Sequence, residues 1–194
     1  MLNPILVSRK YELGSILIIN NNTMPSLSKA KGNSFERATA DFLTQLYGER
    51  FMRAPGSGAY IGGKNTHRKE FLHEGQIRTF KGDIIPGESF PRFNAECKSY
   101  RDFPFHQLFS GSVKILDSWI QQCTDVADPG DFNVIFMKFN RKGTYVAVET
   151  QPNNSHLTFT RHFNYTAGLA GHWMIMDHDL FWELNADLVK QLCQ

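Results

Sequence analysis

Asp83, Glu96 and Lys98 are the three side chains of this sequence best suited to do chemistry together. Two short apolar segments, residues 81–85 and 93–98, flank a Pro-Gly turn, which predicts a hairpin of two strands. Because side chains alternate along a strand, Glu96 and Lys98 would share one face, and Asp83 on the neighbouring strand would join them. Such a cluster is costly unless a cation or a phosphate neutralises it.

Hard oxygen ligands of this kind suit Mg²⁺, with a substrate phosphate completing the coordination shell. Lys98 would then orient an attacking water or stabilise the charge that develops on phosphate. The alternative is a solvated salt bridge between Glu96 and Lys98, with Asp83 as an ordinary turn residue.

A helix is predicted to follow Asn33 or Ser34 as its N-cap, because apolar residues recur at helical spacing up to Tyr47. Gly48 would end it. Glu36 lies at the border of the apolar stripe, where it would reach an adjacent site as a third carboxylate. The alternative is a favourable acid in the first turn of a helix.

A short strand with Arg53 runs into a turn of Pro, Gly and Ser, residues 55–58. Small residues let backbone N–H groups approach a phosphate, and an arginine can hold a phosphate through two hydrogen bonds. Most such turns only reverse the chain, which is the alternative here.

In this order, the motifs resemble those of the PD-(D/E)xK nuclease superfamily, and within it the archaeal-type Holliday junction resolvases. They are Lys-Gly-x-x-x-Glu-Arg ending at Arg37, Arg-x-x-Gly-Ser ending at Ser57, then Asp83, then Glu96-x-Lys98. The resemblance covers residues 31–149. It implies a Mg²⁺-dependent endonuclease, with Mn²⁺ as a substitute, that acts as a homodimer making paired cuts in four-way DNA junctions.

The resemblance also implies roles for single residues. Metal ligands would be Asp83, Glu96, the backbone carbonyl of Cys97, and Glu36, and Lys98 would assist the chemistry. Residues for DNA handling or catalysis would be Arg37, Arg53 and Ser57.

One departure from the resolvases is an insertion between the Gly-Ser turn and Asp83, residues 58–82. It is rich in glycine from Gly58 onward and basic at Lys64, Arg68 and Lys69, which predicts a loop that contacts the DNA backbone. An ordinary solvated loop is the alternative. Gln107, near the start of a helix predicted over residues 105–122, is a further candidate to face the site or the DNA.

The other elements complete an α/β fold with a restriction-endonuclease-like mixed central sheet flanked by helices. A nearly continuous apolar run over residues 134–139 predicts a central strand buried on both faces, with a partner over 144–148. Further strands are predicted over 157–159 and 173–176, and a helix over 179–192.

Length and composition suit a single domain over residues 31–194, preceded by an N-terminal extension, residues 1–30. The net charge is only +2, so any surface for phosphate must be local. The apolar run at residues 16–19 is too short to cross a membrane. Three widely spaced cysteines favour location in a reducing cytoplasm. The gene could belong to a cell, a phage or a virus.

Two other functions stay open at this point. The same motifs serve restriction-type and repair-type DNA endonucleases, which the chemistry of the site does not separate. A DNA-binding protein without activity on the same fold is the third possibility, and the complete set of Glu36, Asp83, Glu96 and Lys98 argues against it.

Overall fold

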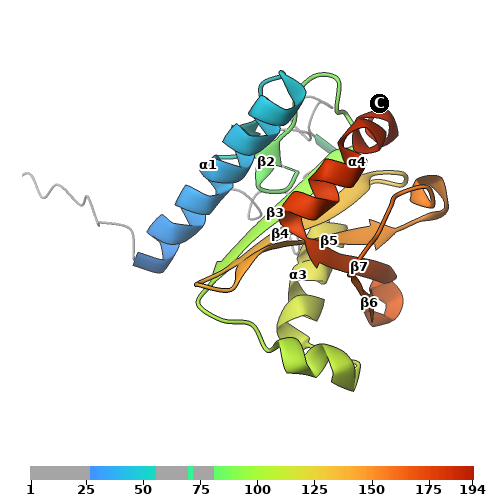
Figure 1. The fold of residues 1–194 in the computed structure, drawn as a ribbon. Coiled ribbons are helices and arrows are strands. Elements are labelled where there is room, and N and C mark those ends of the chain that lie inside the picture. Colours follow the sequence, from blue (N-terminus) through green and yellow to red (C-terminus); the bar gives the residue numbers. More distant parts are fainter. Residues whose placement is uncertain (1–26, 56–69, 72–80) are drawn as a thin grey trace, which may run out of the picture.

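The computed structural model describes residues 27–55, 70–71 and 81–194. The helices are α1 (Leu27–Tyr47), α3 (Lys114–Thr124) and α4 (His178–Leu192), with short 3-10 helices η2 (Phe105–Ser110), η3 (Pro152–Asn154) and η4 (Gly168–Ala170). The strands are β1 (Met52–Arg53), β2 (Ile84–Ile85), β3 (Phe93–Tyr100), β4 (Phe132–Phe139), β5 (Gly143–Thr150), β6 (Phe163–Thr166) and β7 (His172–Asp177) (Figure 1).

Five strands form one mixed sheet in the order β3-β4-β5-β7-β6. β3 and β4 are parallel, with Glu96 opposite Ile135, and the other neighbours are antiparallel. A parallel pair needs a crossover, which runs through α3. As predicted, β4 is almost completely buried on both faces, since Lys138 is the only exposed residue along it.

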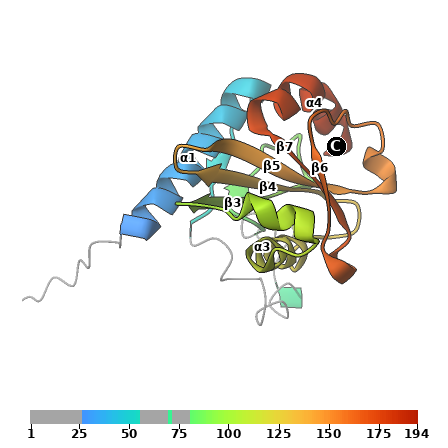
Figure 2. The ribbon, with the colours of Figure 1, turned by 60° about the horizontal axis from the view of Figure 1, so that its bottom comes forward.

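Helices cover both faces of this sheet, with α1 and α4 on one side and α3 on the other (Figure 2). Alternation along each strand divides the core accordingly. Phe93, Ala95 and Cys97 of β3 join the cluster under α1 and α4. Ile135 and Met137 of β4 join the cluster around Trp119 of α3. The predicted α/β class, a mixed central sheet flanked by helices, is confirmed.

The aromatic residues near the C-terminus are core. Trp173, Phe181 and Trp182 are at most 2% exposed. The three cysteines are free and buried. None of the helices in the described part of the chain has the length and apolar character that crossing a bilayer requires.

The predicted hairpin between residues 81–85 and 93–98 is wrong in its strand pairing. β2 pairs with β1 in a separate two-stranded sheet, and β3 takes β4 as its partner. A parallel pairing with the long buried strand β4 buries more apolar surface than a short hairpin would. The segment before β2 nevertheless lies against β3, because the Asp83 N–H donates to the Ala95 carbonyl over 2.8 Å.

Three other local predictions are also wrong. α1 begins at Leu27, so Asn33 and Ser34 lie inside the helix, which the good helix formers before them extend. The helix over 105–122 is interrupted at Gly111, whose φ of 89° is left-handed and ends η2. Residues 157–159 form no strand and pack as loop beneath α4.

Several predictions lie outside the described residues. They concern most of the extension 1–30, and the insertion 58–82 apart from residues 70–71 and 81–82. They include the DNA-contacting roles of Ser57, Gly58, Lys64, Arg68 and Lys69.

Candidate active site

Asp83 lies between the outer edge of β3 and the end of β1. Its backbone N–H donates to the Ala95 carbonyl over 2.8 Å, and its own carbonyl accepts from the Ala54 N–H over 2.8 Å. Its side chain is held as well, since Oδ2 accepts from the Cys97 N–H over 2.8 Å. These three bonds fix the carboxylate beside Glu96.

Gly82 makes this close approach possible. Its φ of 70° is left-handed, and a Cβ at this position would lie 2.5 Å from the Ala95 carbonyl oxygen. Any other residue would therefore push the chain away from β3 and carry Asp83 with it.

We predict that Gly82→Ala destabilises the fold by more than the 1–2 kcal/mol or so that a left-handed alanine costs. Gly48→Ala is the matched control, because Gly48 has a φ of 66° and a Cβ added there would meet nothing within 4 Å. Equilibrium urea unfolding of both variants measures the difference. Equal losses of unfolding free energy in the two variants would show that the contact of the added Cβ with Ala95 does not destabilise the fold.

Glu96 and Lys98 share one face of β3, as alternation predicts, and they point toward α3. Lys98 Nζ lies 2.8 Å from Glu96 Oε2 and 2.7 Å from the Gln122 side-chain oxygen. Glu96 is fully buried, yet no donor among the described residues reaches its Oε1. A buried carboxylate oxygen without a donor is costly, which indicates a ligand at this position.

The ionisation of the pair follows from its burial. Loss of solvation raises the pKa of Glu96 to about 8, and the negative charge of Asp83 adds to this rise. Burial lowers the pKa of Lys98, but the attraction of Glu96 outweighs it, and Lys98 remains protonated. Without a cation Glu96 is therefore largely protonated at neutral pH, and a bound cation would favour its carboxylate form.

Glu36 reaches the same site from α1. It is 9% exposed, and its Oε2 accepts a short hydrogen bond from Arg53 Nε on β1. Arg53 Nη2 also donates to Asn33 Oδ1 over 2.9 Å. Burial raises the pKa of Glu36, although the hydrogen bond from Arg53 opposes the rise. The nearby charges of Asp83 and Lys98 act on the same carboxyl group, which places all of them in one electrostatic site.

Side chains of this site supply only some of the oxygen ligands that a hard cation needs. Among the described residues, no three His, Cys, Asp or Glu side chains are grouped as a metal centre. Asp83 and Glu96 supply two carboxylates, and the Cys97 carbonyl points to the same edge of β3 as its N–H, toward Asp83. Mg²⁺ commonly takes one or two carboxylates, with water and substrate phosphate as the remaining ligands. These residues fit such an ion.

The structure separates Gln107 from this site. Gln107 is exposed on η2, and Phe105 of the same short helix packs on Phe139. Phe139 is level with Tyr100, four residues beyond Glu96 along β3. Arg37 is exposed on α1, one residue from Glu36.

Two polar residues of the site were not predicted. Gln122 sits in the last turns of α3 beside the buried Cys123, and Asn33 lies one turn before Glu36 on α1. A polar side chain at the border of an apolar helix stripe was the available signal for Gln122. That signal alone does not say which strand the helix packs on.

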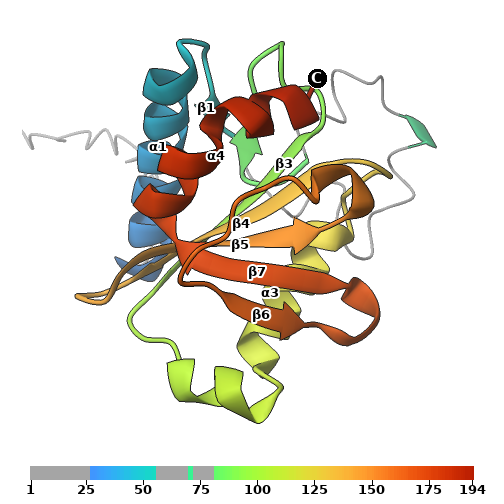
Figure 3. The ribbon, with the colours of Figure 1, turned by 45° about the vertical axis from the view of Figure 1, so that its right-hand side comes forward.

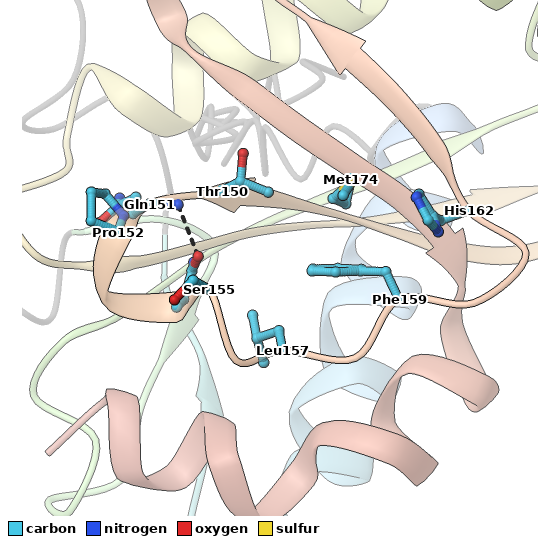
Figure 4. A pocket seen from close by; sticks show the side chains of 9 residues that line it. Thr150, Gln151, Pro152, Ser155, Leu157, Phe159, His162 and Met174 are labelled. Atoms are coloured by element: carbon cyan, nitrogen blue, oxygen red, sulfur yellow. Dashed lines mark hydrogen bonds between the residues drawn. The ribbon is translucent and has the colours of Figure 1, made fainter.

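A separate cavity of about 440 Å³ lies between the end of β5 and the loop that leads to β6 (Figure 4). Leu157, Phe159, His162 and Met174 are among its lining residues. No carboxylate belongs to its described lining, so it contributes nothing to the acidic site.

The fold and the acidic edge of β3 together define a nuclease-like α/β protein, and comparison with known families agrees. A model of the phage putative PDDEXK endonuclease family matches residues 27–172, from α1 to the start of β7. The chain belongs to this family, and the predicted PD-(D/E)xK superfamily is thereby confirmed. No curated protein and no solved structure matches the chain.

Proposed function

We propose that the protein is a Mg²⁺-dependent DNA endonuclease that hydrolyses phosphodiester bonds at the edge of β3. The observation that carries this proposal is the buried Glu96 Oε1, which receives no hydrogen bond from the described part of the chain and lies next to the Asp83 carboxylate. A divalent cation would satisfy that oxygen and neutralise the two carboxylates. Mn²⁺, which favours the same ligands, is expected to substitute.

Asp83, Glu96 and the Cys97 carbonyl would hold the cation. When bound, it would supply Lewis-acid polarisation of the scissile phosphate and lower the pKa of an attacking water. Glu36 remains a proposed additional ligand, through water, because its Oε2 is engaged by Arg53.

The remaining steps use side chains of the chain itself. Lys98 is protonated, and it has three donors, whereas the described residues give it two partners, Glu96 and Gln122. The third donor can stabilise charge that develops on the phosphate, or orient the nucleophile. Arg53 is bonded to Glu36, and its remaining guanidinium donors can hold a neighbouring phosphate.

For the substrate, we propose four-way DNA junctions cut by a homodimer. The order of motifs from Glu36-Arg37 to Glu96-x-Lys98, which resembles that of junction resolvases, supports this finer assignment. Two sites related by a twofold axis would make the paired cuts that a junction requires. Restriction-type or repair-type cleavage is the alternative.

One experiment tests both the endonuclease activity and the preference for junctions. It compares cleavage of a synthetic four-way junction, a flap and a matched linear duplex, each with Mg²⁺ and with EDTA. We expect symmetric paired cuts in the junction with Mg²⁺ and none with EDTA. Equal cutting of all three DNAs would retain the endonuclease and reject the junction preference. Binding of DNA without cutting under any divalent ion would reject the endonuclease itself.

A further inference from the structure

A groove lined by arginines borders the acidic site. The groove, of about 310 Å³, runs between the second half of α1 and the strand β1, which lie side by side in Figure 3. Three arginines line it, Arg37 from α1 and Arg50 and Arg53 from the segment that enters β1. Asp41 is the single acidic residue among its described lining, so positive charge dominates the groove.

The Thr44 side chain, which lines the groove, links α1 to the segment that enters β1. The Phe51 N–H donates to Thr44 Oγ1 over 3.0 Å, and that hydroxyl donates to the Ala40 carbonyl over 2.8 Å. Phe51 and Ala40 are both buried. Since α1 and the start of β1 are bonded here, the backbones that carry Arg37 and Arg50 keep a fixed separation without a ligand.

The three arginines differ in their partners. Arg53 is committed to Glu36 and Asn33, which anchors the groove to the catalytic carboxylates. Within residues 27–55, 70–71 and 81–194, that is the one ion pair made by an arginine of this groove. Arg37 and Arg50 are exposed, and neither makes an ion pair with the described acidic residues, Asp41 included. Guanidinium groups without carboxylate partners are suited to bind phosphate through paired hydrogen bonds.

We propose that this groove is a second phosphate subsite, in which Arg50 and Arg37 bind a DNA backbone phosphate next to the scissile one. The inference rests on the proposed endonuclease function and adds the path of the DNA strand to it. The strand leaves the acidic site past Arg53 and crosses the second half of α1. Arg50 acts by binding and positioning the strand, because the groove meets the acidic site through Arg53 and its bond to Glu36.

The first test is DNA binding across a salt series in EDTA. Arg50→Gln and Arg37→Gln should each weaken binding about tenfold at low salt. Each should also flatten the slope of log affinity against log salt by about 0.9, the value for one phosphate contact on duplex DNA. Arg161→Gln is the matched control, since Arg161 is exposed in the loop before β6, the strand at the opposite edge of the sheet. A slope for Arg50→Gln equal to that of the control would overturn the inference.

The second test locates the phosphate. DNA with one uncharged methylphosphonate at each position flanking the cut should lose affinity for the wild-type protein at one position. Arg50→Gln should be insensitive to that same replacement. If wild type binds and cuts DNA but no position shows this coupling, the subsite is wrong and the endonuclease stands. If wild type neither binds nor cuts DNA, both proposals are overturned.

Discussion

Asp83→Asn and Glu96→Gln are each expected to abolish Mg²⁺-dependent DNA cleavage, by about a thousandfold or more. Stabilisation of transition-state charge by a metal is worth several kcal/mol, and each 1.36 kcal/mol is a factor of ten in rate. The fold should survive, because the asparagine Oδ1 can still accept from the Cys97 N–H and the glutamine can still accept from Lys98. Removal of one negative charge should leave DNA binding in EDTA unchanged or tighter.

Glu183→Gln serves as the control, since this exposed residue of α4 loses the same charge away from β3. Single-turnover cleavage with saturating protein separates the chemical step from binding. Calorimetric titration with Mg²⁺ gives a second readout that does not depend on activity, and heat of binding should vanish in Glu96→Gln. Robust cleavage by either purified variant would remove Asp83 and Glu96 from the chemistry.

The pairing of Glu96 with Lys98 could be predicted from sequence because it depends only on local geometry. Residues two apart on any strand share a face, whichever strand lies beside it. The burial of β4 was predictable for a similar reason, as a continuous apolar run leaves no face for water. Both predictions needed no knowledge of which elements pack together.

The partners of the site residues could not be predicted in that way. Gln122 meets Lys98 only because α3 crosses beneath β3, and Arg53 meets Glu36 only because β1 lies along α1. The wrong hairpin has the same origin, since residues 81–85 suit either β1 or β3 by pattern. Contacts between residues far apart in sequence depend on the global packing, which no local propensity encodes.

The Glu36–Arg53 pair changes the expectation for both residues. The sequence predicts a third metal-binding carboxylate and a separate phosphate-binding arginine, whereas the structure joins them by a hydrogen bond. A guanidinium has five donors, so Arg53 can keep Glu36 and Asn33 and still bind a phosphate. The arginine thereby sets the position of Glu36 and connects the acidic site to the groove formed with Arg37 and Arg50.

Lys98→Ala is expected to lower the single-turnover rate by about a hundred- to a thousandfold, with a much smaller effect on DNA affinity. A donor that acts mainly on charge developed in the transition state is worth this much when it is lost. Lys98→Arg should not restore the rate, because a planar guanidinium cannot occupy the space between Glu96 and Gln122 as a compact ammonium does. An unchanged rate in Lys98→Ala would reduce the pair to a structural salt bridge.

Gln122 offers a finer version of the same experiment, with its neighbour in sequence as a matched control. Gln122→Ala removes one of the two acceptors that orient Lys98, whereas Gln121→Ala removes an exposed glutamine bonded to Asp125. We expect Gln122→Ala to lower the single-turnover rate roughly tenfold, the effect of one lost hydrogen bond to a charged group. Gln121→Ala should match wild type. Since Lys98 still holds its charge in both variants, a loss confined to Gln122→Ala would show that the direction of the ammonium contributes to the rate. Equal rates would mean that Glu96 alone positions it.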